Sequence, residues 1–342
     1  MKICINALLI FISSILIYSC RKVEKLPLPN VTTDKVTRIS YKSAYVTGTL
    51  ISVEEGLPLR GACYSTSENP TIKDSTVSGH YIYPQSDFML EDLLPNTIYY
   101  TRAFVTTKAG TGYGEQVQFR TLQDYTGQTG SVTDADGNTY HTIGIGSQFW
   151  TVENLRTTKF LDGTPIQNIT DKTSWYNASS PAYSVYNNDL TYKLTYGLLY
   201  NWYALDLTAN NKKICPVGWH IPTSDEWNTL QTDLSDNNIQ TDMGYKNVEN
   251  KLRQAGSLHW TDGASNDQYT NITGFTILPG GSRNIFGYFG GIGNVAFLWV
   301  SNIVADSQPE YIRLDELGII PEFGESHKKE GYSVRCIKDN AQ

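Results

Sequence analysis

The stretch CPVGWHIPTSDEW, residues 215–227, decides the fold of the longer part of this chain. It contains the start of a helix, because Thr223 can cap the helix while Glu226, three residues later, returns a hydrogen bond to the backbone of Thr223. Trp227 and Leu230 then follow at helical spacing on one face. We therefore predict an amphipathic helix that begins after Thr223 and packs on a hydrophobic core.

A second, shorter helix is predicted over residues 248–255. Val248 and Leu252 share one face there, and Gly256 provides a stop. Short strands are predicted at residues 275–278, 297–300 and 332–337.

Four further blocks frame the opening stretch: FWTVENL (149–155), GLLYNWYA (197–204), LPGGSR (278–283) and GYSVRC (331–336). Together with residues 215–227 they resemble the Fibrobacter succinogenes major paralogous domain, which occurs in lipoproteins and surface proteins of Bacteroidetes and Fibrobacteres. The resemblance covers residues 128–339. It implies a domain of the cell envelope, and it supplies no reaction because the biochemical role of the family is largely undefined.

A more distant resemblance concerns residues 222–227 and 331–336. They are similar to two landmarks of the formylglycine-generating enzyme fold, which is related to C-type lectins. This resemblance implies an irregular α+β domain with two helices, a small antiparallel sheet and long loops.

The cysteines take their expected role from the same resemblance. Formylglycine-generating enzymes use a pair of cysteines, which holds copper in the aerobic type. Cys215 and Cys336 lie in the segments that carry the resemblance, so we expect them to form a disulfide between the beginning of the helical region and the last strand. In the chain-entropy model, closing a loop of that length contributes on the order of 4 kcal/mol, and secretion favours the oxidised state.

The composition divides the chain into two parts. All seven tryptophans lie beyond the junction at residues 127–130, which supports an independent second domain: Trp150, Trp175, Trp202, Trp219, Trp227, Trp260 and Trp299. A formal net charge of -7 and the lack of any Lys/Arg run argue against a nucleic-acid partner.

The first domain is predicted over residues 31–122 as a β-sandwich, because it consists of short alternating segments separated by turns. Strands are expected at residues 43–50, 99–105 and 116–120. The run LPNTIY at residues 94–99 resembles the turn and tyrosine corner of fibronectin type III domains, and residues 61–65 and 68–71 resemble the version common in Bacteroidetes surface proteins. This resemblance implies spacing or protein contact. We expect Cys63 to be a small buried hydrophobic residue, with a reactive thiol as the alternative.

The N-terminus resembles the signal of a bacterial lipoprotein. Lys2 precedes an apolar run at residues 3–18, and the following Ser19 and Cys20 complete a match to a lipobox. We expect residues 1–19 to be a signal peptide, Cys20 to carry the lipid, and residues 20–30 to form a tether to the outer membrane. An uncleaved membrane anchor is the alternative, since the apolar run is almost long enough to span a bilayer. The residues after Cys20 lack an acidic cluster of the kind that often accompanies surface export, so the face of the outer membrane stays open.

Two loops carry oxygen ligands that could hold a cation. Asp134, Asp136 and Asn138 alternate, but Thr139 and Ile145 occupy the positions where an EF-hand loop needs glycine and glutamate, so we predict a hairpin turn. Asp262, Asn266 and Asp267 form the second group, for which a solvated loop is the preferred interpretation.

Signatures of catalysis are weak throughout. The five histidines are scattered, and we expect His220 to pack near the helix start. We expect a non-catalytic envelope lipoprotein without a cofactor, which recognises a glycan or protein through loops that bear Tyr and Trp. The alternatives are a structural envelope protein and a divergent enzyme on the formylglycine-generating scaffold.

Overall fold

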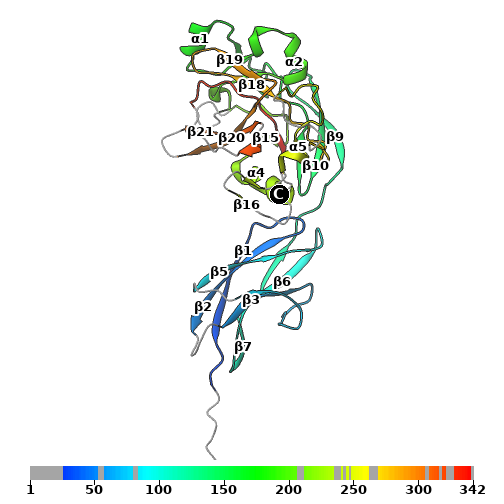
Figure 1. Ribbon diagram of the computed structural model, residues 1–342, viewed down its shortest axis with the longest axis vertical. Coiled ribbons are helices and arrows are strands. Elements are labelled where there is room, and N and C mark those ends of the chain that lie inside the picture. Colours follow the sequence, from blue (N-terminus) through cyan, green and yellow to red (C-terminus); the bar gives the residue numbers. More distant parts are fainter. Residues whose placement is uncertain are drawn as a thin grey trace, which may run out of the picture.

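The computed structural model describes residues 26–52, 58–79, 84–205, 212–234, 240–241, 244–245, 248–261, 269–304, 308–315, 318–320 and 327–339. The predicted signal peptide and Cys20 lie outside these residues. Two parts follow one another along the long axis of the molecule (Figure 1). Strands β1 to β8 form the first part, called the sandwich below, and share no sheet with the strands of the second, C-terminal part.

The sandwich consists of two sheets. The first has the order β1-β2-β5, with β1 at Asn30–Thr37, β2 at Ala44–Ser52 and β5 at Gln85–Leu90. The second has the order β4-β3-β6-β7, with β3 at Leu59–Ser65, β4 at Ser75–Gly79, β6 at Ile98–Thr107, β7 at Gly110–Tyr113 and β8 at Val117–Arg120. Because β7 and β8 pair with successive halves of β6, they form one interrupted edge strand.

Alternation of side chains explains the sandwich. In β6, which contains the strand predicted at residues 99–105, one of the two alternating faces is buried, with Tyr99, Thr101, Ala103 and Val105 exposed by 7% or less. The backbone N–H of Leu94 donates to the hydroxyl of Tyr99 at 3.0 Å, which is the tyrosine corner expected of a fibronectin type III-like domain.

The C-terminal part is also mostly β. One sheet has the order β15-β23-β11-β10-β9, with β9 at Thr129–Thr133, β10 at Thr139–Ile145, β11 at Gln148–Thr151, β15 at Trp219–His220 and β23 at Ile337–Lys338. A second has the order β19-β18-β20-β21-β22, with β18 at Gly280–Arg283, β19 at Phe289–Ile292, β20 at Ala296–Val304, β21 at Gln308–Asp315 and β22 at Gly318–Ile320. Smaller sheets join β12 (Gln167–Asn168), β13 (Ala182–Ser184) and β14 (Leu199–Tyr200), and β16 (Gln240–Thr241) with β17 (Gly244–Tyr245).

The helices are short. They are α1 at Lys172–Tyr176, α2 at Thr191–Tyr196, α4 at Ser224–Leu234 and α5 at Val248–Leu252, with 3-10 turns η1 at Tyr186–Asn188 and η2 at Trp202–Ala204. The predicted capping box of α4 is confirmed: the N–H of Glu226 donates to Thr223 Oγ1 at 3.2 Å, and the N–H of Thr223 donates to Glu226 Oε2 at 2.8 Å. Among the described residues, no helix combines the length and apolar character that crossing a bilayer would require.

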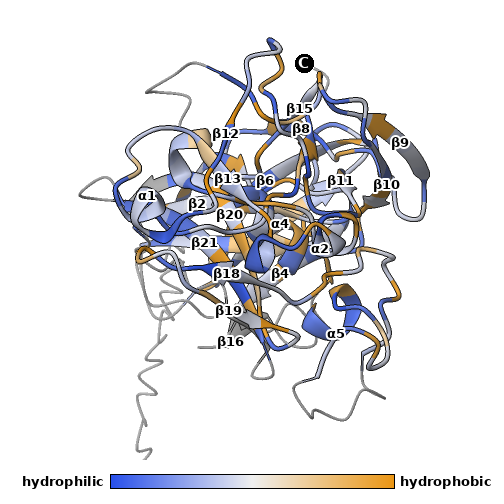
Figure 2. Ribbon diagram, turned by 90° about the horizontal axis from the view of Figure 1, so that it is seen from above, coloured by the Kyte–Doolittle hydropathy of each residue, from blue (hydrophilic) through white to orange (hydrophobic). Residues whose placement is uncertain are grey.

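Among the described residues, three hydrophobic clusters lie in the C-terminal part: α4 contributes Trp227 and Leu230 to one of the two large clusters, and a small one surrounds Trp175 of α1. Figure 2 shows the contrast between the apolar strand β20 in the interior and the hydrophilic helix α5 at the margin. All seven tryptophans are buried. The expectation that loops present tryptophan to a ligand is therefore wrong.

Three predicted elements differ in the structure. The helix expected at residues 248–255 ends at Leu252, because Arg253 leaves it to form a bridge with Ile277. The strand expected at residues 275–278 is interrupted at Thr276. The φ of this residue, 56°, lies in the left-handed region, so only the bridge of Ile277 remains. The segment 332–337 forms isolated bridges before β23 begins at Ile337.

Candidate binding surface

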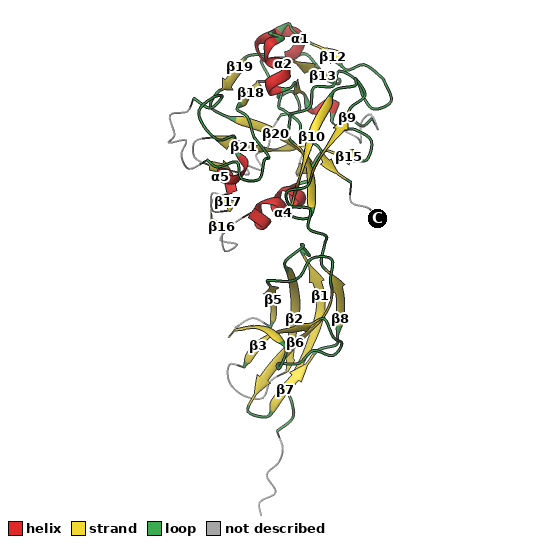
Figure 3. Ribbon diagram, turned by 90° about the vertical axis from the view of Figure 1, so that its right-hand side faces the viewer, coloured by secondary structure: helices red, strands yellow, loops and turns green. Residues whose placement is uncertain are grey.

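Three exposed aromatic side chains gather at the end of the molecule opposite the sandwich. Tyr176, Phe286 and Tyr288 are 48%, 55% and 57% exposed. The rings of Tyr176 and Phe286 stack with centroids 5.9 Å apart and an interplanar angle of 12°. Their supports, α1 and the β18–β19 hairpin, lie at the far end in both side views (Figures 1 and 3). We call these three residues the distal aromatic surface.

The hairpin turn fixes two of these rings. Asn284 Oδ1 accepts hydrogen bonds from the backbone N–H of Phe286 and of Tyr288, each at 3.0 Å. Gly287 between them has a φ of 79°, and a Cβ there would lie 2.8 Å from the Cα of Lys172. The turn therefore requires glycine and holds both aromatic residues in one backbone conformation.

A buried guanidinium joins the hairpin to α1. Arg283 donates to the carbonyls of Gly287 at 3.2 Å and Thr170 at 3.0 Å, and also to that of Ile169. Its guanidinium lies 4.3 Å from the ring centroid of Trp175. Burial lowers the pKa of Arg283 to about 10, so the side chain stays charged at neutral pH. Because one side chain donates hydrogen bonds to backbone carbonyls of both segments, α1 and the hairpin form a single rigid support.

Helix α1 is fixed independently at both ends. Its first turn is capped by Asp171, whose Oδ1 accepts from the N–H of Ser174 at 2.8 Å. Inside it, Trp175 is fully buried and donates from Nε1 to the carbonyl of Lys329 at 2.9 Å. Tyr176 at the end of α1 is thereby presented to solvent on a preorganised backbone.

Two lysines lie against the rings. Lys172 Nζ is 4.2 Å from the ring centroid of Tyr288, and Lys329 Nζ is 5.0 Å from that of Tyr176. Lys329 Nζ also donates to the carbonyl of Tyr176 at 2.6 Å. Cation–π contacts of this kind orient the ammonium groups. The surface thus combines apolar ring faces with fixed positive charge.

Exposed leucines extend the apolar character toward α2. Leu190 and Leu194 are 72% and 76% exposed. Beneath the surface, the buried ring of Tyr186 lies 5.4 Å from that of Phe289 and 5.7 Å from that of Tyr192, so the β18–β19 hairpin and α2 pack on a common aromatic side chain.

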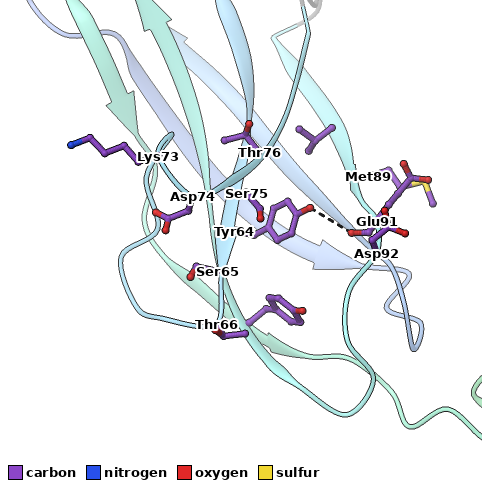
Figure 4. Close-up of a pocket in the computed structure, with 12 residues that line it drawn as sticks. Tyr64, Ser65, Thr66, Lys73, Asp74, Ser75, Thr76, Met89, Glu91 and Asp92 are labelled. Atoms are coloured by element: carbon purple, nitrogen blue, oxygen red, sulfur yellow. Dashed lines mark hydrogen bonds between the residues drawn. The ribbon is translucent and has the colours of Figure 1, made fainter.

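The sandwich carries a second candidate, a polar cleft of about 830 Å³ beside β3, β4 and the end of β5 (Figure 4). The hydroxyl of Tyr64 donates to the carbonyl of Glu91 at 3.4 Å across it, and Lys73 points away from it. Asp74 Oδ2 already accepts from the N–H of Thr71 at 2.8 Å. Its polar groups are largely engaged with each other, so this cleft is the weaker candidate.

A third concavity of about 540 Å³ lies between the two parts. It is lined by residues 38–45 of the sandwich and by Asp225, Asn228, Thr229, Thr232 and Asp233 of α4. Lys42 Nζ donates to the carbonyl of Asp233 at 2.9 Å across the junction. Burial raises the pKa of the Asp233 carboxyl to about 7. We interpret this region as the contact that orients the two parts.

The predicted cysteine roles are confirmed where the structure describes them. Cys215 and Cys336 form a disulfide whose Cα atoms are 6.0 Å apart. Cys63 is fully buried with a free thiol, and burial raises its pKa to about 11, so it is the buried hydrophobic residue that we expected. Cys20 lies outside the described residues.

The predicted hairpin turn at Asp134 is confirmed. β9 and β10 pair on either side of it, and the Asp134 carboxylate accepts from the N–H groups of Asp136 and Asn138 at 2.9 Å each and from the hydroxyl of Tyr140 at 2.5 Å. The second oxygen-rich loop, residues 262–267, lies outside the described residues. Within the residues that the structure describes, no group of three or more His, Cys, Asp and Glu side chains could hold a metal ion.

His220 lies at the start of α4, as predicted. Its Nε2 is 2.9 Å from Glu226 Oε1, and its Nδ1 is 2.6 Å from Asp339 Oδ1. The hydrogen bond with Glu226 raises the pKa of His220 despite partial burial. Because both ring nitrogens face carboxylates, neither is open to take a proton from a substrate.

Sequence reasoning missed the distal aromatic surface. The alternation of aromatic residues with glycine at residues 286–293 was the available signal, and it indicated only a loop or bent strand. Tyr176 is more than a hundred positions away from Phe286, so only the fold brings the two rings together.

Comparisons with known proteins give one family match and several similar solved structures. The model of the Fibrobacter succinogenes major domain family matches residues 143–338. No curated protein shows significant similarity. Among solved structures, the sensor domain of the anti-sigma factor RsgI4 of Pseudobacteroides cellulosolvens is 17% identical, with a TM-score of 0.23, over 29% of this chain and 98% of that one. A fibronectin type III domain of the human KIAA0970 protein is also 17% identical, with a TM-score of 0.22, over 28% of this chain and 75% of that one.

Proposed function

Because the chain belongs to the Fibrobacter succinogenes major domain family, we propose that it is a non-catalytic binding module of the cell envelope. Its ligand, a glycan, would be recognised on the distal aromatic surface. The observation that carries this proposal is the rigid presentation of Tyr176, Phe286 and Tyr288 to solvent. Aromatic side chains provide large contact areas at little conformational entropy cost, and a fixed backbone lowers that cost further.

The position of the N-terminal segment supports display away from a membrane. Leu28 and Pro29 lie against Gly110 and Gly112 of β7, at the end of the sandwich far from the C-terminal part (Figure 1). A lipid on Cys20 would anchor that end. The sandwich would then act as a spacer that holds the distal aromatic surface away from the outer membrane. The disulfide is consistent with an extracellular location.

Absence of catalysis is part of the proposal. The two cysteines that a formylglycine-generating site would need as thiols are joined in the disulfide, and His220 is held between carboxylates. We retain the C-type lectin-like interpretation of the C-terminal part as a proposal, since its mostly β architecture and few short helices support only a coarser description.

Glycan binding is tested on the chain from Leu26 to its end, which contains every described element. We expect retention on a polysaccharide array, and we expect Phe286→Ala and Tyr176→Ala to weaken it by about tenfold each, the effect of a well-packed aromatic contact. Val217→Ala is the control, because this side chain is 77% exposed but is not part of the surface. Binding that survives both aromatic substitutions would overturn the proposed site, and no binding to any polysaccharide would favour a structural role.

The anchor is tested separately in cells. We expect an alkyne-labelled fatty acid to be incorporated into the wild-type chain and not into Cys20→Ala. A wild-type chain without label, or a Cys20→Ala chain that keeps it, would contradict lipidation at this residue.

A further inference from the structure

The distal aromatic surface differs in charge from the protein as a whole. The chain has a formal net charge of -7, yet Lys172 and Lys329 lie directly against the exposed rings. Among the described residues, neither ammonium group forms an ion pair with a carboxylate, and their contacts are to rings and to a backbone carbonyl. Both positive charges are therefore open to a ligand.

Two carboxyl groups are sequence neighbours of these lysines. Asp171 accepts hydrogen bonds from the N–H and hydroxyl of Ser174, at 2.8 and 2.9 Å; these bonds lower its pKa, so it keeps its negative charge, but it is engaged in capping α1 and forms no ion pair with Lys172 among the described contacts. Burial raises the pKa of Glu330 to about 7, which leaves this neighbour of Lys329 substantially protonated near neutral pH. Lys172, Lys329 and the buried Arg283 therefore bring three cationic side chains to the aromatic residues of this end, although the chain as a whole is acidic.

The geometry combines two kinds of contact at once. Each ammonium group lies over one face of a tyrosine ring, so the ring surface that stays exposed can take the C–H face of a sugar while the ammonium group takes an anion on the same sugar or the next one. A peptide with acidic side chains would meet the charges but would gain less from flat ring faces.

We infer that the distal aromatic surface binds an acidic polysaccharide, whose uronate carboxylates pair with Lys172 and Lys329 while its sugar rings stack on Tyr176, Phe286 and Tyr288. This inference rests on the proposed function and names its ligand class. It also predicts a dependence on ionic strength, because exposed ion pairs are screened by salt.

Polygalacturonate and its methyl-esterified form provide a matched pair of probes, since they share a backbone and differ in charge. Binding to the chain from Leu26 onward is measured by titration calorimetry in calcium-free buffer. We expect polygalacturonate to bind more tightly than the ester and to lose affinity as salt is added. The double variant Lys172→Gln, Lys329→Gln should weaken polygalacturonate binding by about tenfold and weaken binding of the ester by clearly less.

Three further measurements complete the test. Phe286→Ala should weaken both polymers, whereas Lys73→Gln, at an exposed lysine of the sandwich, should weaken neither. Equal binding of the acid and the ester, with no effect of the lysine substitutions, would overturn the acidic ligand while the Phe286 effect preserved the proposed function. Polyglutamate that binds as tightly as polygalacturonate, together with a harmless Phe286→Ala, would overturn both.

Discussion

In the sandwich, β3 pairs with β6 over seven residue pairs, from Leu59 with Thr106 to Ser65 with Tyr100. In the C-terminal part, β11 joins β23 through a single pair, Trp150 with Ile337. The first part meets the hydrogen-bonding needs of its backbone with long ladders. The second has long irregular segments, and those needs must be met in another way.

Backbone bonds between loops, such as that from the N–H of Leu155 to the carbonyl of Val334 at 2.7 Å, meet part of those needs, and buried arginines meet another part. Arg335 donates from Nε to Asn154 Oδ1 at 3.0 Å and from its two terminal nitrogens to the carbonyls of Phe275 and Thr276. Arg283 does the same for the carbonyls beneath the distal aromatic surface. A guanidinium offers five donors in one plane, so one side chain can connect several loops. The comparison teaches that the loops of the C-terminal part depend on single long-range links, the guanidinium groups and the disulfide, so the loss of one such link should be costly.

Removing the disulfide should produce the largest effect. The bond closes a loop with a sequence separation of 121, and we expect Cys215→Ala with Cys336→Ala to lower the free energy of unfolding of the C-terminal part by about 4–5 kcal/mol. Tryptophan fluorescence during denaturation reports this part alone, because all seven tryptophans lie in it. Hydrogen exchange of β3 and β6 in the same samples is the control and should not change. If the sandwich lost as much stability as the C-terminal part, the two parts would not be stabilised independently of each other.

Removing one buried arginine should come next. Arg335→Met deprives two backbone carbonyls and Asn154 of their donor, and we expect a loss of about 3–5 kcal/mol in the same fluorescence measurement. Arg335→Lys keeps the charge but lacks the planar set of donors, so it should recover only part of the loss. A fully stable Arg335→Met chain would mean that apolar packing, and not the guanidinium, holds these loops.

The same contrast explains how much the sequence could predict. The strand at residues 99–105, part of β6, and the start of α4 were predicted correctly because their signals are local: alternation in one case and a capping box in the other. Arg283 was missed, since its acceptor Ile169 is 114 positions away and no local pattern marks such a partner. The apolar run at residues 275–278 suggested a strand, but Thr276 adopts a left-handed backbone while Arg335 binds the carbonyls on either side of the bend.

In the candidate site, too, some features could be predicted from the sequence and others could not. The disulfide could be expected from a family resemblance in the segments that hold Cys215 and Cys336. The distal aromatic surface could not, because Tyr176 and Phe286 come from separate segments that meet only over the buried Arg283.

Asp233 tests whether the two parts are coupled. Its carboxyl is 7% exposed and faces Lys42, Asp124 and Tyr41, and burial raises its pKa from 3.8 to about 7. An acid whose pKa is raised by folding stabilises the folded state most at pH values below the pKa that it has in the unfolded chain. The stabilisation by Asp233 should therefore be complete below about pH 4 and be lost as the pH rises to about 7. A shift of about 3 units sets an upper limit of about 4 kcal/mol on the change.

The measured quantity is the difference in the free energy of unfolding between wild type and Asp233→Asn. The substitution removes the titration of this one group, and taking the difference removes the contribution of all other carboxyl groups, which both chains share. We expect the two to be equally stable at pH 4, and the variant to be the more stable above pH 7. Asp225→Asn, at an exposed position on the same helix, is the control. A difference that does not vary with pH would show that Asp233 is solvated and that the junction does not couple the parts.

The smallest effect should come from the cap of α4, where the C-terminal part uses a local device like those of the sandwich. Thr223→Ala removes the oxygen that accepts from the N–H of Glu226, and we expect a loss of about 1 kcal/mol, recovered by Thr223→Ser. The loss should stay small because Glu226 keeps its hydrogen bonds to the N–H of Thr223 and to His220. A loss as large as that of Arg335→Met would mean that α4, and not the guanidinium network, is the main support of this part, and would reverse the comparison between its local and long-range devices.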